Sequence, residues 1–449
     1  MNFTPNNLIH KTSQECAKSE LDLFHTPETQ AMILSGKWVD YHPISVIDGD
    51  SPLEFKIAGS GDEYIDLSQT YLHVNCKFEN ANGTDITAGK VIAPVNLLFY
   101  AMFAQCDIMW NDVLVTASSN MHSYRCIIEI LTNYGPDALN SLYQSAFFYK
   151  DTAGNMDSLT VLPGTSDVDV PKYNLGFHKR RSFAAESKVI DLIGRLHSDI
   201  FFQDRYLLNN VEMKIRLSRN KHSFCYIGDV NTYKLNILSA TLFIRKAKIN
   251  PDVMLAHAMV LEKNTAKYPI NRVETKVLTL SQGIMNTVQD NISTGAIPSR
   301  VVLAMVDSDA YNGVHNKNPF NFKHNFLSKV SFSIDGEDAP YKALELDFEN
   351  NRYTRGFHSL FLGTNKTIPN CGSVINLHNF GNGYAIFAFD LTGDLTDGSH
   401  FNLVRSGNLR MNLTFAKKLD EAICCIIYIE FQNLIEINKN RQVLFDYKI

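Results

Sequence analysis

The feature that most constrains the fold is an alternation of apolar and polar residues that recurs along the chain. It indicates β-strands with one buried face, because successive side chains of a strand point to opposite sides. The clearest examples are residues 72–78, 211–217, 330–334 and 409–415. The pattern predicts an all-β protein built from antiparallel sheets.

Three other segments refine this prediction. The runs VVLAMV (301–306) and AICCIIYIEF (422–431) are apolar in both phases, so we expect inner strands covered on both faces. In YKLNILSATLFIRK (233–246) the alternation slips near Ile237 and Leu238, which predicts a β-bulge. GRLHSDIFF (194–202) is expected to be a strand that carries His197 and Asp199 on one face.

Few segments have a helical pattern. Ser119 or Asn120 is expected to cap a helix that ends before Gly135. A second, short helix is predicted over 137–147. A third begins at Pro251, a residue type favoured in the first helical turn.

The third helix separates two strand-rich regions of similar length, so we interpret it as a linker between two β-sandwich domains lying side by side. The predicted parts are an N-terminal arm (1–35), a first domain (36–250) and a second domain (251–449). The linker helix occupies 251–264 of the second domain.

Long segments with little periodicity interrupt both halves. They cover residues 151–181, 307–325 and 362–383. Loops of this length are costly to order for packing alone, so we expect them to form functional surfaces.

Composition and charge exclude several classes of protein. The 449 residues include 42 Lys+Arg and 47 Asp+Glu, a net charge of −5, with 45% hydrophobic residues. This mix is that of a globular protein, and no run of about 18 apolar residues indicates a membrane span. No strong direct binding to DNA is expected.

One stretch, 201–250, carries a local charge of +6. We interpret it as the solvated face of two strands, and the alternative is a surface that faces an acidic neighbour or a packaged polyanion. The basic residues concerned are Lys214, Arg216, Arg219, Lys221, Arg245, Lys246 and Lys248.

The search for catalytic motifs is negative. The chain lacks a phosphate-binding loop, a dinucleotide fingerprint, a zinc-protease motif and a nucleophile elbow. The eight cysteines contain no C-x-x-C pair and are expected to be mostly buried free thiols, as in the strand that holds Cys424 and Cys425. We therefore predict no enzyme activity, no cofactor and no metal.

Two acidic segments come nearest to a cation site. Residues 307–313 (DSDAYNG) resemble a calcium loop, but Tyr311 stands where an oxygen ligand is needed. Asp390, Asp394 and Asp397 follow a strand and could bind a cation, but turn formation by Asp and Gly explains them equally well.

Nine segments in a fixed order, spread over most of the chain, carry a resemblance to a known family. They are WVDYHPIS (38–45), GSGDEYIDLSQTYLHV (59–74), APVNLLFYAMFAQCDIMWNDVLV (93–115), YKDTAGNMD (149–157), GRLHSDIFFQDRYLLNNVEMKIRL (194–217), LEKNTAKYPINRVE (261–274), NPFNFKHN (318–325), NGYAIFAFDLTGDL (382–395) and VLFDYKI (443–449). In these segments the chain resembles the double jelly-roll major capsid proteins of Polinton/Maverick elements and adintoviruses, including copies integrated in animal genomes.

The resemblance implies a double jelly roll, two eight-stranded antiparallel β-sandwiches with a few short helices and long loops. It implies a structural protein of an icosahedral double-stranded DNA virus or a virus-like transposon, located in the virion capsid and assembled inside the host cell. The implied partners are two further copies in a homotrimeric, pseudo-hexameric capsomer, neighbouring capsomers and a single jelly-roll penton protein. The N-terminal arm would lie under the shell.

Aromatic loop segments are the candidate contacts between subunits, because aromatic residues are enriched at interface centres. The residues are Phe147, Phe148, Phe320, Phe322 and Phe357. The alternative is that these rings fill the ends of the sandwiches.

Two other functions remain open from the sequence. One is a carbohydrate- or surface-binding β-sandwich, which exposed aromatic residues would serve. However, only Trp38 and Trp110 are tryptophans, and Trp110 lies in an expected core strand. The other is a jelly-roll enzyme, which would need a convergent set of histidines and carboxylates.

Overall fold

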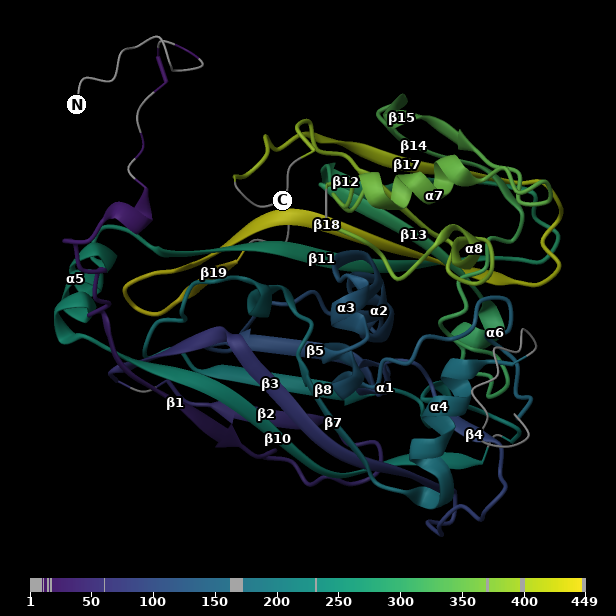
Figure 1. Ribbon diagram of the computed structural model, residues 1–449, viewed down its shortest axis with the longest axis horizontal. Coiled ribbons are helices and arrows are strands. Elements are labelled where there is room, and N and C mark those ends of the chain that lie inside the picture. Colours follow the sequence, from purple (N-terminus) through teal and green to yellow (C-terminus); the bar gives the residue numbers. More distant parts are fainter. Residues whose placement is uncertain are drawn as a thin grey trace.

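The computed structural model describes residues 10, 12–13, 16, 18–59, 61–161, 173–230, 232–368, 371–395 and 400–445 (Figure 1). It contains two stacked β-sandwiches, joined by helix α5 at one end of the molecule, and α2 and α3 lie between them (Figure 1). The expected Asp397 and the last four residues of the segment 443–449 lie outside the described residues.

The first half contains two four-stranded sheets. One has the order β1-β10-β3-β7 and the other β2-β8-β5-β6, with a separate pair, β4-β9. The strands are β1 (Ile33–Tyr41), β2 (Leu53–Ile57), β3 (Glu63–Asn80), β4 (Ile92–Pro94), β5 (Phe103–Trp110), β6 (Val113–Leu114), β7 (Ile190–Arg195), β8 (Met213–Arg219), β9 (Tyr226–Gly228) and β10 (Tyr233–Ile249).

The second half repeats this arrangement. Its sheets have the orders β11-β18-β13-β16 and β12-β17-β14-β15, and β19 is added beside β18. The strands are β11 (Ala266–Leu280), β12 (Asn286–Ala296), β13 (Arg300–Asp307), β14 (Leu327–Ile334), β15 (Glu337–Glu345), β16 (Ile386–Asp390), β17 (Ser406–Phe415), β18 (Ile423–Ile437) and β19 (Val443–Phe445).

The two halves share one topology. Counting the eight principal strands of each half, one sheet joins the first, eighth, third and sixth strands, and the other joins the second, seventh, fourth and fifth. Each half is therefore an eight-stranded jelly roll, and the chain is a double jelly roll, as the resemblance implied. No sheet of the described chain contains strands from both halves. The predicted domain limits stay predictions.

The helices connect strands and lie mainly at one side of the sheets (Figure 1). They are α1 (Leu98–Ala101), α2 (His122–Asn133), α3 (Pro136–Leu139), α4 (Leu175–Ala184), α5 (Pro251–Leu261), α6 (Ser308–Tyr311), α7 (Thr354–Leu362) and α8 (Leu377–Phe380). Short 3-10 turns include η2 (Ser19–Leu21), η3 (Leu142–Ala146), η4 (Ala185–Ser187), η5 (Asp199–Phe202) and η6 (His222–Phe224). None of the helices in the described part of the chain is long and apolar enough to cross a bilayer.

Several strand predictions are confirmed. The pairing of β10 with β3 shifts register between Ile237 and Ser239, where the alternation slips phase. All eight residues of β13 are buried, and β18 is buried on both faces from Ile423 to Phe431. Both strands lie inside their sheet, which explains the uninterrupted apolar runs.

Other local predictions are wrong. Strand β7 ends at Arg195, and residues 199–202 form the 3-10 turn η5 rather than a continued strand. The helix expected over 137–147 is divided into α3 and η3. Helix α2 begins after Met121 and has no side-chain cap, so neither Ser119 nor Asn120 caps it.

Helix α4 lies inside the segment predicted as a long loop. Asn174 caps it, and its side-chain oxygen accepts a hydrogen bond from the Phe177 backbone N–H at 3.2 Å. Its sequence, LGFHKRRSFA, has buried and exposed residues in no clean stripe, and so gives little periodic signal.

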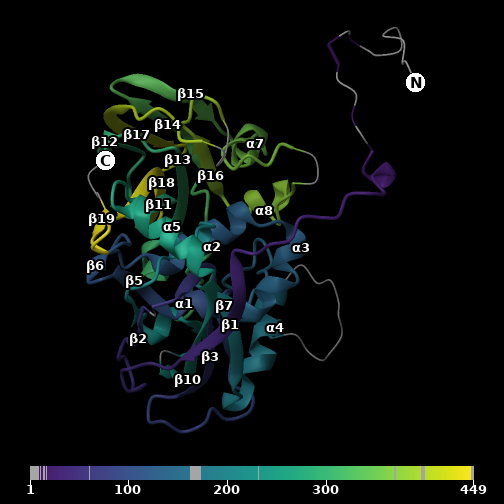
Figure 2. The ribbon, with the colours of Figure 1, turned by 90° about the vertical axis from the view of Figure 1, so that its left-hand side faces the viewer.

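Residues 18–32, which precede β1, run away from the body of the molecule in both views (Figures 1 and 2). Residues 18–32 are all exposed, including Leu21, Leu23 and Phe24. The segment is tied to the fold at its end, where the Asn250 backbone N–H donates to the Met32 carbonyl oxygen at 2.9 Å. Asn250 Nδ2 also donates to the Ala31 carbonyl oxygen at 3.2 Å, so the segment is anchored at Ala31 and Met32 while its side chains stay exposed.

The close approach of α7 to β16 depends on a glycine. A Cβ atom added at Gly363, which ends α7, would lie 2.5 Å from the carbonyl oxygen of Ala388. We predict that Gly363→Ala lowers the free energy of unfolding by about 1–3 kcal/mol, because helix and strand must separate. The control is Gly393→Ala, since a Cβ there meets nothing within 4 Å. Urea unfolding measures both variants, and equal midpoints would contradict this packing.

Candidate functional site: the polar seam between the two halves

The two jelly rolls meet along one face of the sheet β11-β18-β13-β16. Helix α2 contacts β11 and β18 there, and η5 contacts β11. Eleven of the twelve residues of α2 are buried, including charged Arg125 and Glu129. A charged residue buried at such a contact needs a partner, because its desolvation is costly. We define the polar contacts between the halves as the seam.

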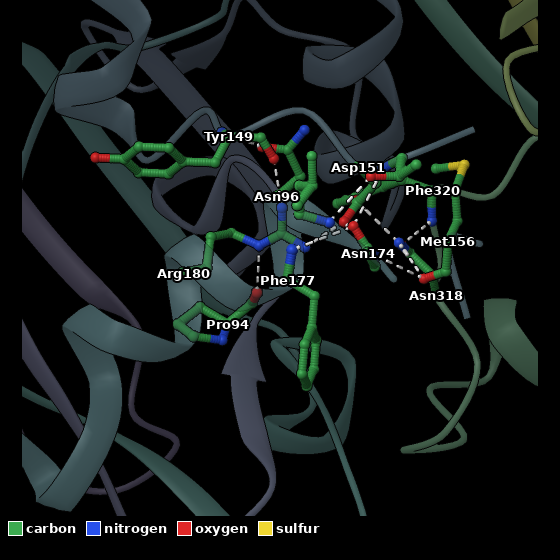
Figure 3. Close-up of polar contacts among 12 residues, drawn as sticks. Pro94, Asn96, Tyr149, Asp151, Met156, Asn174, Phe177, Arg180, Asn318 and Phe320 are labelled. Carbon is green, nitrogen blue, oxygen red and sulfur yellow. Dashed lines mark hydrogen bonds and ion pairs between the residues drawn. The ribbon is translucent and has the colours of Figure 1, made fainter. Parts of the chain in front are cut away.

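The first polar cluster of the seam is centred on Arg180 of α4 (Figure 3). Its side chain is fully buried, and its Nη2 lies 2.5 Å from Oδ1 of Asp151, which is also buried. Its Nε donates to the Pro94 carbonyl oxygen at 2.7 Å, and its Nη1 donates to the Tyr149 carbonyl oxygen. The guanidinium group thus ties α4, β4 and the segment after η3 together.

The second half completes this cluster. Asn318 Nδ2 donates to Asp151 Oδ2 at 3.0 Å, and the Tyr384 hydroxyl donates to the Asp151 carbonyl oxygen at 2.9 Å. Asn174 Nδ2 donates to the other carboxylate oxygen, Oδ1, at 2.8 Å (Figure 3). Both carboxylate oxygens of Asp151 are therefore satisfied, which a buried ion pair needs in order to offset its desolvation.

The second polar cluster joins α2 to η5 and β18. Arg125 places its Nη2 2.5 Å from Asp199 Oδ1 and its Nε 3.0 Å from Glu129 Oε1. His197 Nδ1 lies 2.7 Å from Glu129 Oε2, and the Tyr428 hydroxyl of the second half donates to Glu129 Oε1 at 3.3 Å. One carboxylate thus collects contacts from three separate elements.

The protonation states follow from burial and charge. Burial alone would raise the pKa of Glu129, but the positive charge of Arg125 and the hydrogen bond from His197 outweigh it and lower this pKa to about 2. Burial lowers the pKa of His197 below its usual value, against the opposing effect of Glu129. The carboxylate is therefore charged and the imidazole neutral near pH 7, so their contact is a hydrogen bond from the ring N–H.

A cavity of about 820 Å³ lies beside the second cluster and is lined by both halves, including Arg205, Asn271 and Gln432. Part of its charged wall, formed by Arg125, Glu129 and Asp199, consists of groups paired with one another. In the described part of the chain, no group of three or more His, Cys, Asp or Glu residues has the geometry to hold a metal ion. The arrangement serves to fix the two jelly rolls relative to each other, since its polar groups bond across the seam.

The structure brings His197 and Asp199 into one cluster, although they do not share a strand as predicted. Of the acidic turn, Asp390 Oδ1 accepts from the Thr392 backbone N–H at 2.8 Å and from its hydroxyl at 2.6 Å, which is turn formation. Six cysteines are buried free thiols, whereas Cys16 and Cys371 are exposed.

The candidate subunit contacts lie mostly inside the chain. Phe147, Phe148, Phe320 and Phe322 are at most 4% exposed, and Phe357 is partly buried. Phe320 contacts Tyr124 and Phe224 of the first half, with ring centroids 5.8 Å apart in each pair. Contacts with another subunit stay a prediction for these rings, and their burial favours the alternative that they fill the sandwich ends.

The basic stretch is largely neutralised within the chain. Lys214 lies 2.5 Å from Asp112, Arg216 lies 3.3 Å from Glu54, and Arg245 lies 3.1 Å from Asp66 (side-chain N to O distances). These ion pairs fit the interpretation as the outer faces of β8 and β10.

The residues of the Arg180 cluster were not identified from the sequence. Asp151 and Arg180 stand at the ends of a segment without periodicity, and Asn318 lies in another. Their only local signal is Asn174 before a possible helix, a residue type favoured at N-caps. Contacts between such distant residues exist only once the chain has folded.

Comparison with known proteins bears on the whole chain. No family model matches it. An uncharacterized protein of Caenorhabditis elegans, F54H12.2, is 24% identical over 436 residues, which cover 94% of this chain and 99% of that protein.

Solved structures resemble it over nearly their full length. A chain of the Sputnik virophage has a TM-score of 0.62 and 12% identity, and covers 99% of this chain and 95% of its own length. The Faustovirus major capsid protein has a TM-score of 0.55 and 10% identity, and the match covers 94% of this chain and 93% of that protein. The mavirus major capsid protein has a TM-score of 0.53 and 10% identity, and the match covers 97% of this chain and 96% of that protein. At these identities the likeness shows a shared double jelly-roll fold.

The Arg180 cluster generates a stability prediction. Replacing Arg180 with Met leaves Asp151 as a buried charge without its cation, so we expect a loss of about 3–5 kcal/mol in the free energy of unfolding. The matched control is Arg181→Met, because Arg181 is only partly buried and donates to a backbone carbonyl oxygen rather than to a carboxylate, so it should lose less than about 1 kcal/mol. Urea unfolding compares the two variants, and similar midpoints would show that the pair does not stabilise the seam.

The second cluster generates a pH prediction through His122, the first residue of α2. Burial, with the charge of Arg125, lowers its pKa to about 3. The unfolded chain binds a proton at this residue below about pH 6.5, whereas the folded chain does so only near pH 3. Folding stability therefore falls on acidification through this window, by at most about 1.4 kcal/mol per pH unit for this residue.

His122→Leu should flatten that dependence of the unfolding free energy between pH 6.5 and 4, whereas His25→Leu, at an exposed position, should not. Denaturant unfolding at a series of pH values measures both slopes. An unchanged slope in His122→Leu would mean that this histidine is already charged in the folded chain.

Proposed function

We propose that this chain is a major capsid protein, the structural subunit of an icosahedral shell around double-stranded DNA. The observation that carries the proposal is the presence of two equivalent jelly rolls in one chain, joined by hydrogen bonds that Asn318, Tyr384 and Tyr428 of the second half donate to buried residues of the first. The likeness over nearly full length to the Faustovirus and mavirus major capsid proteins supports it.

The geometry suits a building block of a shell. A subunit whose two domains are locked together loses little conformational entropy on assembly, so weak contacts with neighbours suffice to hold it. The proposed assembly is a homotrimer in which six jelly rolls form a pseudo-hexameric capsomer. Capsomers would then contact one another and a single jelly-roll penton protein in the virion.

The origin of the chain belongs to the same proposal. The ordered segments resemble the capsid proteins of Polinton/Maverick elements and adintoviruses, whose copies occur in animal genomes. A relative of nearly equal length in a nematode supports this origin. The internal ion pairs of the basic stretch support a protein that does not itself bind DNA strongly.

The alternative of a carbohydrate-binding β-sandwich has less support. Trp110 is completely buried, and Trp38, half exposed on β1, lies on an open sheet rather than in a cleft. The structural role also accounts for the seam, which a sugar-binding module would not need. A glycan array on the purified chain would separate the two.

The proposal is tested by the mass of the purified chain in solution. Size-exclusion chromatography with light scattering should give three times 50.7 kDa at micromolar concentration. Interfaces of stable oligomers bury more than about 2,000 Å², so the trimer should persist on tenfold dilution. A single-chain mass at every concentration up to the solubility limit would contradict the proposed function.

A further inference from the structure

A cavity of about 350 Å³ lies at one end of the second jelly roll. Its walls come from the connection between β12 and β13, the connection between β16 and β17, and the middle of β18. Leu391, Leu403, Val404 and Phe431 give it a largely apolar lining. No residue of the Arg180 or Glu129 cluster lines it, so the cavity has no part in the seam.

The rim of this cavity exposes both apolar side chains and unpaired backbone. Leu403 is 93% exposed and Val404 is 72% exposed. Within the part of the chain that the structure describes, the backbone N–H and C=O groups of these two residues make no hydrogen bond. An extended peptide can therefore pair with this stretch and place its side chains in the cavity, as in recognition by strand addition.

The N-terminal arm leaves the body of the molecule at the same end. Asn250 holds Ala31 and Met32 by hydrogen bonds and caps helix α5, which leads into β11. Strands β11 and β13 are both antiparallel to β18, so both begin at one end of their sheet, and the cavity lies just before β13. The cavity is therefore at the end where α5 and the arm are found (Figure 1).

The arm carries apolar side chains that nothing covers. Leu21, Leu23 and Phe24 are 75%, 76% and 92% exposed. The backbone groups of Leu23 and Phe24 make no hydrogen bond with any described residue. Three large apolar side chains in four residues are unfavourable in water, and their burial in an apolar cavity would remove this cost.

The charges of the arm and the cavity are compatible. Residues 18–32 contain three acidic residues and one basic residue. Arg405 is exposed on the cavity wall, where its guanidinium group donates to a backbone carbonyl oxygen and, among the described residues, pairs with no carboxylate. Asp394, the acidic residue of the wall, lies 2.6 Å from His400 (Oδ2 to Nε2) and is thus already paired.

We propose that residues 21–24 of the arm of a second copy of this chain dock in this cavity, with the arm backbone beside Leu403 and Val404. The arm of the same chain runs away from the body, which leaves its own cavity open (Figures 1 and 2). In a shell, equivalent ends of neighbouring subunits lie side by side, so each arm meets the cavity of another copy. The inference rests on the proposed function and names one contact that joins subunits.

A peptide tests the cavity. The full-length chain carries Leu21→Ser, Leu23→Ser and Phe24→Ser, so that its own arms do not compete for the site. A fluorescein-labelled peptide with the sequence of residues 18–32 is then added, and fluorescence anisotropy measures its binding. We expect binding that saturates.

Substitutions at the rim locate the bound peptide. Adding Leu403→Glu should weaken the binding at least about tenfold, because a carboxylate on the rim is unfavourable next to apolar and acidic residues of the arm. Val288→Glu is the control, because Val288 is 55% exposed on β12 and does not line the cavity. Circular dichroism and the thermal midpoint show that each variant is folded.

A cysteine pair identifies which copy supplies the arm. In a background with Cys16→Ser and Cys371→Ser, which removes the exposed thiols, Phe24→Cys and Leu403→Cys are combined. Oxidation should link different chains, and mass spectrometry of the digest should find the disulfide between positions 24 and 403. A disulfide within one chain would leave the single-chain mass and would overturn the second copy as the occupant.

The outcomes separate this inference from the function on which it rests. Peptide binding that Leu403→Glu weakens and Val288→Glu does not, with a disulfide between chains, supports the inference. A trimeric chain that binds no peptide, or binds it equally in both variants, would overturn the docking and leave the capsid function standing. A wild type that is monomeric at every concentration would overturn the proposed function and, with it, the second copy.

Discussion

The arrangement of this molecule depends on the buried ion pair between Arg180 and Asp151. The pair is fully removed from water, and its hydrogen bonds reach β4, α4 and, through Asn318, the second half. A buried ion pair whose polar groups are all hydrogen-bonded contributes less to the free energy of unfolding than to the selection of one conformation. An alternative packing of its groups would leave a buried charge without a partner. Both charges belong to the first half, so the position of the second half depends on the hydrogen bonds that Asn318 and Tyr384 donate to Asp151. The cluster around Glu129 is linked to the second half by the hydrogen bond that the Tyr428 hydroxyl donates.

Much of the fold follows from periodicity. The alternating strands, the doubly buried β13 and β18, the bulge between Ile237 and Ser239, and the linker helix at Pro251 all have local signals in the sequence. These signals are local because a strand or a helix presents its buried face at a fixed interval. The pattern of two similar halves was visible for the same reason.

The seam could not be predicted in this way. Asp151, Arg180 and Asn318 are polar residues in segments without a period, and an aperiodic polar residue is usually solvent-exposed. Their burial is decided by the meeting of segments that are between 29 and 167 residues apart in the chain. The Phe residues could not be placed from the sequence for another reason, because an aromatic residue in a loop fits a subunit interface and a core equally well. Only the folded structure shows that Phe320 and Phe322 are buried inside the chain.

The repeated topology connects the structure to its proposed role. One chain with two equivalent domains can form a ring with fewer separate parts, because each copy brings two jelly rolls that are already joined. The most direct test is cryo-electron microscopy of the purified chain. The account predicts particles with a hexagonal outline in which three chains place six jelly rolls around a threefold axis. Particles of one chain, or dimers with twofold symmetry, would contradict it.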